Sequence, residues 1–187
     1  RARDGELGDA LHAVGVGLEG VDNWGEAWPW YARAATEKAD YGGADDDGIG
    51  ESLHRAAACL ARERRLDEAD AFFERAVERR RRRGGRRSGL AKSLFGRGDV
   101  VLDLGRAIDA LALFEEAAAL FTKPGGGAPV DHDAIARALL RVCDCLRLLG
   151  RAEALTATLD RARAEALIGD PDGHIDPLLV EAIDAAR

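Results

Sequence analysis

Methionine is absent from this 187-residue sequence, and aromatic side chains make up only 5% of it. Runs of β-branched and aromatic residues with alternating polarity, which β-strands need, are missing too. Hydrophobic residues account for 47% of the chain, and most of them are Ala and Leu. These deficits argue against a β-sheet and predict an all-α protein.

No apolar run reaches 18 residues, and the N-terminus lacks the basic-then-apolar order of a secretion signal. Cys59, Cys143 and Cys145 are an odd number of thiols, and the last two point to different faces of one predicted helix. They are interpreted as small core residues in a reducing compartment rather than as a disulfide or a metal site. The expected location is therefore the cytoplasm, and the missing start methionine suggests a fragment of a longer protein.

Lysine is scarce, because Lys38, Lys92 and Lys123 are the only lysines among 27 basic residues. The net charge of −7 argues against a general nucleic-acid binder. The preference for Arg, together with abundant Ala, Gly and Asp, favours an origin in a GC-rich bacterial genome.

Residues 50–83 hold two amphipathic helical patterns separated by a short break near Arg65. Apolar residues recur in each pattern at the spacing of one helix face. The two stripes are Leu53, Ala56, Ala57 and Leu60, and then Ala69, Phe73 and Ala76. Small residues allow two helix axes to approach closely, so this segment predicts a helical hairpin.

The second stripe recurs along the chain at steps of 42, 41 and 45 residues. Its four versions are Ala27/Tyr31/Ala34, Ala69/Phe73/Ala76, Ala110/Phe114/Ala117 and Leu155/Leu159/Ala162. This alternation of small and large residues over two helices resembles the tetratricopeptide repeat (TPR) family. Steps near 42 are similar to the longer-helix variety found in kinesin light chains and bacterial signalling proteins.

The resemblance implies an αα-hairpin superhelix, a TPR-like solenoid forming one domain over residues 1–187. Four hairpins are expected at about residues 8–41, 50–83, 91–124 and 136–169. A ninth helix over residues 177–187 is expected to cap the last hairpin.

In TPR proteins the first helices of successive hairpins line a concave groove that grips a peptide or a partner helix. Carried over by matching helix face, the partner-binding groove would contain His12, His54, Arg55, Arg62, Lys92, Phe95, Asp99, Asp103, Arg137, Arg141, Asp144 and Arg147. This surface turns basic toward the last hairpin, which favours an acidic peptide or helix as partner. The groove has no Asn, so the carboxylate clamp of the chaperone-tail binders is not expected.

The leading hypothesis is a non-catalytic protein-binding scaffold. A sensor domain for a small molecule or signalling peptide and a structural self-association unit are the alternatives. The four histidines fall in different segments and no nucleophile motif is visible, so neither a catalytic residue nor a cofactor is predicted. Asp45, Asp46 and Asp47 lack the spacing of a calcium loop, so no metal site is predicted.

Two features keep two interpretations each, and a third, Gly96, has one. The cluster Trp24, Trp28, Trp30 and Tyr31 either caps the exposed end of the array or is a binding hot spot. The arginines between residues 79 and 87 either stabilise a helix C-terminus, where the helix dipole favours positive charge, or contact an acidic ligand. Gly96, which weakens its helix without an evident packing reason, marks a point where a ligand could approach closely.

Overall fold

The computed structural model describes residues 6–40, 46–82, 87–123, 125 and 129–169. These residues form eight helices and no strand, in agreement with the all-α prediction. The helices are α1 (Glu6–Glu19), α2 (Trp24–Asp40), α3 (Asp46–Arg62), α4 (Leu66–Arg82), α5 (Arg87–Asp103), α6 (Ala107–Phe121), α7 (His132–Leu148) and α8 (Ala152–Gly169). The expected capping helix at residues 177–187 lies outside the described residues. None of the described helices is long and apolar enough to span a membrane.

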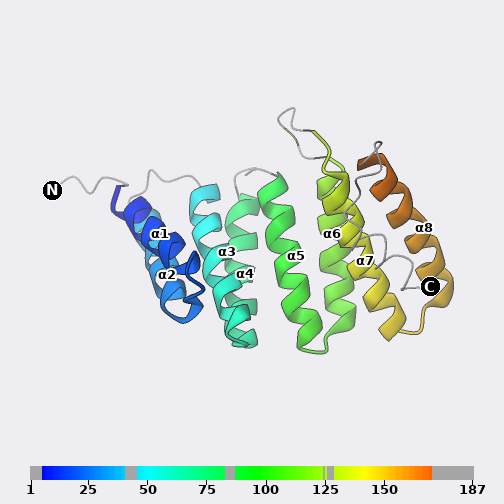
Figure 1. Cartoon of the computed structure of the whole chain (residues 1–187), viewed down its shortest axis with the longest axis horizontal. Helices are drawn as coiled ribbons and strands as arrows, with labels where there is room; N and C mark the ends of the chain where they lie inside the picture. Colours follow the sequence, from blue (N-terminus) through cyan, green and yellow to red (C-terminus); the bar gives the residue numbers. More distant parts are fainter. Residues whose placement is uncertain (1–5, 41–45, 83–86, 124, 126–128, 170–187) are drawn as a thin grey trace.

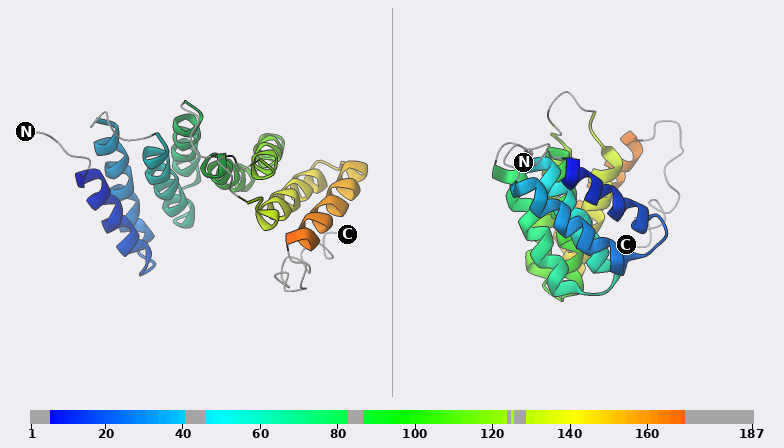
Figure 2. Two further views of the ribbon diagram at one scale, coloured as in Figure 1. Left: turned by 90° about the horizontal axis from the view of Figure 1, so that it is seen from above. Right: turned by 90° about the vertical axis from the view of Figure 1, so that its left-hand side faces the viewer.

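Consecutive helices pair into four antiparallel hairpins that stack in sequence order (Figure 1). Each first helix also packs against the second helix of the preceding hairpin. Successive hairpins are rotated relative to one another, so α5 and α6 are seen nearly end-on where α7 and α8 lie across the view (Figure 2, left). The αα-hairpin repeat fold predicted from the sequence is therefore confirmed.

The same tight turn closes every hairpin. One residue of each turn has a positive φ: Asp22 at 57°, Arg64 at 59°, Gly105 at 78° and Gly150 at 68°. The backbone N–H that follows bonds back five residues, as in Arg106 N to Val101 O at 3.0 Å and Arg151 N to Leu146 O at 2.9 Å. This Schellman arrangement satisfies helix-end carbonyls and reverses the chain.

The core is divided among the interfaces between neighbouring helices, as expected when hairpins bury their faces against one another. Tyr31, Phe73 and Phe114 are buried at equivalent positions of α2, α4 and α6. Glycines face these rings: a Cβ on Gly15 would lie 2.8 Å from Tyr31, and one on Gly98 would lie 2.6 Å from Phe114. The small residues are thus needed for close helix packing.

Gly96 has the packing reason that the sequence did not reveal. A Cβ at this position would lie 2.7 Å from Cζ of Phe73 on α4, the preceding second helix. The glycine therefore lets α5 approach α4, because no larger side chain fits over the phenylalanine ring.

Candidate functional site

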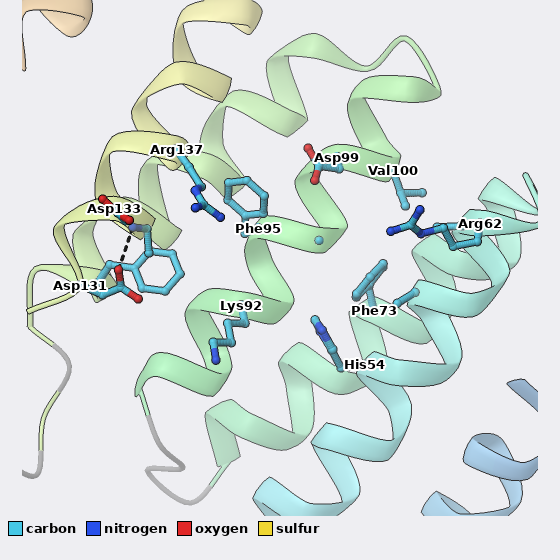
Figure 3. A pocket seen from close by; sticks show the side chains of 15 residues that line it. His54, Arg62, Phe73, Lys92, Phe95, Asp99, Val100, Asp131, Asp133 and Arg137 are labelled. Carbon is cyan, nitrogen blue, oxygen red and sulfur yellow. Dashed lines mark hydrogen bonds between the residues drawn. The ribbon is translucent and has the colours of Figure 1, made fainter. Parts of the chain in front are cut away.

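The first helices α3, α5 and α7 lie beside one another along one side of the array and line a pocket of about 660 Å³ (Figure 3). We call this pocket the trough. It is lined by His54, Ala58, Ala61, Arg62, Phe73, Lys92, Phe95, Gly96, Asp99, Val100, Phe121, Asp131, Asp133, Ala134 and Arg137. Its size lies within the range of ligand pockets in proteins.

The floor of the trough is apolar and rigidly packed. Phe95 stacks edge-on against the buried ring of Phe114, with 5.4 Å between ring centroids. Phe73 makes the same kind of contact with the imidazole of His54 at 5.3 Å. Such pairs hold aromatic rings in one orientation, so the floor presents a fixed apolar surface to a ligand.

Three exposed cations surround this floor, one from each first helix: Arg62 of α3, Lys92 of α5 and Arg137 of α7 (Figure 3). Among the described residues, Lys92 and Arg137 have no acidic group within ion-pair distance. The Arg62 guanidinium lies over the ring of Trp24, 5.4 Å from its centroid. All three charges thus remain available to an anionic group in the trough.

The trough also contains carboxylates, and two of them are already engaged. Asp99 lies 2.8 Å from the Nε of Arg141, and burial raises the pKa of this carboxyl despite the nearby arginine. Asp131 caps α7 by accepting a hydrogen bond of 2.9 Å from the backbone N–H of Ala134. These contacts reduce the capacity of both carboxylates to repel an acidic ligand.

His54 does not add to the positive charge at neutral pH. Burial, and secondarily the cation of Arg80, lowers the pKa of His54 from 6.5 to about 4. Its Nδ1 lies 3.3 Å from the hydroxyl of Ser93 on α5. His12 has the corresponding contact in the first hairpin, 3.0 Å from Ser52 of α3, and its pKa is lowered mainly by burial.

Half of the twelve residues predicted for the groove line the trough. They are His54, Arg62, Lys92, Phe95, Asp99 and Arg137. The other six lie outside it: His12, Arg55, Asp103, Arg141, Asp144 and Arg147. A partner-binding role for any of the twelve stays a prediction.

Most of the residues outside the trough have partners within the chain. Arg55 pairs with Glu19 and Glu51, each at 3.0 Å. Arg141 binds Asp99 and lies 3.3 Å from Asp144, which also pairs with Arg147 at 2.8 Å. Asp103 pairs with Arg64 at 2.6 Å. The sequence showed the charges on these helices but not the acids opposite them, so it overestimated the free positive charge near α7.

Sequence reasoning missed some of the lining residues. The sequence pattern places Phe73 in the core of its hairpin and gives no role to Asp131 or Asp133. The proline and glycine-rich segment before residue 131 signalled a loop, but not that α7 would bring its first turn beside Lys92.

The arginine-rich end of α4 is largely neutralised within the chain. Arg80 is buried and pairs with Asp47 at 3.2 Å and Glu51 at 2.6 Å, and it donates to Ser93 at 2.6 Å. Arg79 lies 3.4 Å from Asp46, and Arg81 lies 2.6 Å from Glu116. Acidic residues in the first turns of α3 therefore bind Arg79 and Arg80, which excludes Arg80 as a surface contact for a ligand.

Two members of the aromatic cluster, Trp24 and Trp28, lie at a junction rather than at the end of the array, so the capping interpretation is wrong for these two residues. Trp24 and Trp28 pack with Ala56 and Cys59 of α3. Trp28 also meets Phe72 of α4 edge-on at 6.2 Å, and the Arg65 guanidinium lies 4.7 Å from its ring centroid. These two side chains join the first two hairpins.

Comparisons with known proteins agree with this geometry. Residues 48–123 match the sequence model of a family described as Tetratricopeptide repeat. No curated protein matches the chain in sequence.

Several solved structures have a similar fold. BtubC (BKLC) from P. vanneervenii superposes with a TM-score of 0.77 at 18% identity, over 87% of this chain and 64% of that one. The kinesin-light-chain-type, nearly identical TPR-like repeats of Podosopora anserina give a TM-score of 0.68 at 14% identity, over 97% of this chain and 95% of theirs. A second crystal structure of these repeats, which carries one substitution, gives 0.69 at 14%, over 97% and 94%. This chain thus spans less than two thirds of BtubC, and at these identities the likeness establishes the fold alone.

Proposed function

We propose that this chain, whose residues 48–123 match the tetratricopeptide-repeat family, is a non-catalytic interaction module that binds an acidic peptide or partner helix in the trough. The observation that carries the proposal is the arrangement of Lys92 and Arg137, two exposed cations without an ion-pair partner among the described residues, beside the apolar floor formed by Phe73 and Phe95. A segment with acidic side chains next to a large apolar one matches both parts of this surface.

Each chemical part of the trough has a separate task in this account. Lys92 and Arg137 attract the acidic groups and set their register, and Arg62 of α3 does the same one hairpin earlier. The floor around Phe95 and Val100 removes an apolar side chain of the ligand from water, at about 25 cal/mol per Å² buried. The exposed cations mainly supply specificity and association rate, since solvent screens them.

The experiment is an array of peptides of about ten residues that vary in acidic content and in one central apolar residue. We expect binding by peptides that combine Asp or Glu with Leu or Phe, and none by their Lys-substituted counterparts. The double variant Lys92→Glu/Arg137→Glu should weaken binding at least about tenfold, and binding to the unmodified chain should fall as salt rises.

The matched control is Arg161→Glu/Arg163→Glu, which reverses the same amount of charge at exposed positions of α8 away from the trough. It should bind the selected peptides almost as the unmodified chain does. Equal losses in both double variants would show that net charge, and not the trough, governs binding, and would overturn the proposal.

A second candidate function is a sensor domain that takes a small anionic molecule. The pocket volume of about 660 Å³ favours it, since drug-sized ligands occupy pockets of this size. Thermal-shift screening of anionic metabolites separates the two candidates, because a small-molecule sensor should be stabilised by one such compound without any peptide. For either function we propose a cytoplasmic, bacterial setting, which suits three cysteines that are buried and unpaired.

A further inference from the structure

The hydrogen bonds of Ser93 determine which nitrogen of His54 carries a proton. Ser93 lies on α5 with no exposed surface, so its hydroxyl must find its partners within the protein. Arg80 Nη1 donates to this hydroxyl at 2.6 Å and occupies one of its lone pairs. Among the described residues, the one acceptor within reach of the hydroxyl proton is Nδ1 of His54, at 3.3 Å. Ser93 therefore donates to His54 rather than accepting from it.

This bond places the proton of the imidazole on Nε2. Nδ1 of His54 acts as an acceptor, and a neutral imidazole carries its single proton on the other nitrogen. The ring is neutral near pH 7, because burial lowers its pKa from 6.5 to about 4. Nε2–H of His54 is thus a hydrogen-bond donor without a net charge.

The first hairpin contains the same pair with a different arrangement. Nδ1 of His12 lies 3.0 Å from the hydroxyl of Ser52, but Ser52 donates to the carbonyl oxygen of Gly48 at 3.2 Å. Because its one proton is used there, the hydroxyl of Ser52 accepts from His12, whose Nδ1 carries the proton. His12 and His54 should therefore be opposite tautomers.

The Nε2–H of His54 is directed into the trough. The imidazole lies with Lys92 on one side and Phe73 on the other (Figure 3). In the part of the chain that the structure describes, Nε2 has no hydrogen-bond partner, and the one fully enclosed polar side-chain atom without a partner is Oδ1 of Asp99. Nε2 is therefore reachable from the trough, and its hydrogen bond must be made by a ligand or by solvent.

The ammonium group of Lys92 completes a binding pair with this donor. Burial, the cation of Arg80 and, in smaller part, the charge of Lys92 lower the pKa of His54, so the two side chains are close. A lysine attracts an anion without a directional preference, whereas an N–H fixes the position of one acceptor oxygen. Such a pair suits a carboxylate, since a phosphate has three acceptor oxygens and nearly two charges to satisfy.

From these contacts we infer that Lys92 and His54 together bind one carboxylate of the ligand, with the ammonium pairing with the anion and the Nε2–H donating to one of its oxygens. This inference rests on the proposed function and names the subsite that holds the acidic side chain. The ring of Phe73, which packs edge-on against His54, lies where the adjoining apolar part of the peptide would contact the floor. Ser93 and Arg80 are positioning residues, because they act through the tautomer of His54.

The first test is the tautomer of His54 in the free, nitrogen-labelled chain, read from long-range proton–nitrogen NMR correlations of the imidazoles at about pH 7.5, where both histidines are neutral. We expect a proton on Nε2 and none on Nδ1 for His54, and the reverse for His12. Ser93→Ala, which removes the hydroxyl, should populate both tautomers of His54. A proton on Nδ1 of His54 in the unmodified chain overturns the inference, whether or not any peptide binds.

The second test is the affinity of trough variants for the tightest acidic peptide from the array. His54→Phe removes the N–H and should weaken binding about tenfold at low and at moderate salt alike, because the donor is uncharged. His54→Gln supplies a neutral N–H near the place of Nε2 and should recover most of the affinity. Lys92→Gln should weaken binding and also reduce its salt dependence, since it removes a screened charge.

His12→Phe is the matched control, because it makes the same change at a histidine outside the trough and should leave the affinity unchanged. Peptide binding that is equally tight in the unmodified chain and in His54→Phe overturns the inference and leaves the proposed function intact. Failure of every peptide to bind overturns the proposed function, and this inference with it. The tautomer measurement uses the unmodified chain, so it decides the inference even if His54→Phe impairs folding.

Discussion

Arg80 of α4 donates a hydrogen bond of 2.6 Å to Glu51 of α3, although its own side chain is only 2% exposed. The same guanidinium donates a hydrogen bond of 2.8 Å to the carbonyl oxygen of Gly89 and one of 2.6 Å to the hydroxyl of Ser93, and both residues are on α5. One side chain thus joins three helices from two hairpins, immediately beside the trough residues His54 and Lys92. Removing part of this network leaves buried polar groups without partners.

Arg80→Ala should destabilise the fold by about 3 kcal/mol, because it breaks a buried ion-paired network and leaves a cavity. Arg82→Ala is the matched control: Arg82 is 62% exposed and lies 3.8 Å from Glu78, so its loss should cost less than about 0.5 kcal/mol. Urea unfolding monitored by circular dichroism measures both. Equal midpoints for the two variants would mean that the Arg80 contacts contribute no net stability.

Phe73→Ala and Phe114→Ala should each cost about 3 to 5 kcal/mol, because both rings are buried and pack against glycines of a neighbouring helix. Phe72, which is only partly buried, should cost less when truncated. Thermal melts of the three variants test this order. Near-neutral effects for Phe73 and Phe114 would contradict their role as the large residues of the hairpin cores.

Gly96→Ala should destabilise by about 1 to 3 kcal/mol, because its Cβ would meet the Phe73 ring. Gly17→Ala, in open space on α1, should instead stabilise by up to about 1 kcal/mol through helix propensity. The measurement is chemical unfolding of both variants in dilute solution. Stabilisation by both alanines would show that α4 and α5 are not in close contact at Gly96.

The stability of the fold should decline between pH 6.5 and pH 4 in part because of His54. Its folded-state pKa of about 4 lies below the ordinary 6.5, so the unfolded chain binds more protons in this window. Above pH 6.5 His54 is uncharged in both the folded and the unfolded chain, so it does not lower the free energy of unfolding. As the pH falls from 6.5 toward 4, protonation of His54 in the unfolded chain lowers the free energy of unfolding. Other groups also titrate there, so the relevant quantity is a difference between variants.

His54→Phe isolates this contribution, because Phe95 shows that a phenylalanine fits the equivalent position of α5. The variant should lose less stability than the unmodified chain when unfolding is compared at pH 7 and pH 5. An identical loss in both proteins would mean that His54 is not kept uncharged by its surroundings.

The repeated contrast of small and large residues is what allowed the fold to be predicted. Ala69 and Phe73 lie within one hairpin, and their spacing along a helix is readable without knowing the rest of the structure. The contacts of Gly96 with Phe73 and of Arg80 with Ser93 join different hairpins. They depend on how one hairpin is placed on the next, which periodicity does not specify.

The sequence predicts which residues share a helix face, and only this part of the site could be predicted from it. Lys92, Phe95 and Arg137 follow from matching the first helices to one another. Arg141 and Arg55 lie on predicted faces too, but Asp99 and Glu19 of neighbouring helices reach them and neutralise them. Pairing across helices depends on side-chain reach in three dimensions, so a one-dimensional pattern overestimates free charge.

The measurement that tests the central claim most directly is a map of backbone amide shifts in the isotope-labelled chain, titrated with the tightest acidic peptide from the array. The proposal predicts that the largest changes lie on α3, α5 and α7, centred on Phe95, Gly96 and Arg137, and disappear in Lys92→Glu/Arg137→Glu. Changes centred on α1, or on the exposed Trp30 of α2, with the trough amides unmoved, would contradict it.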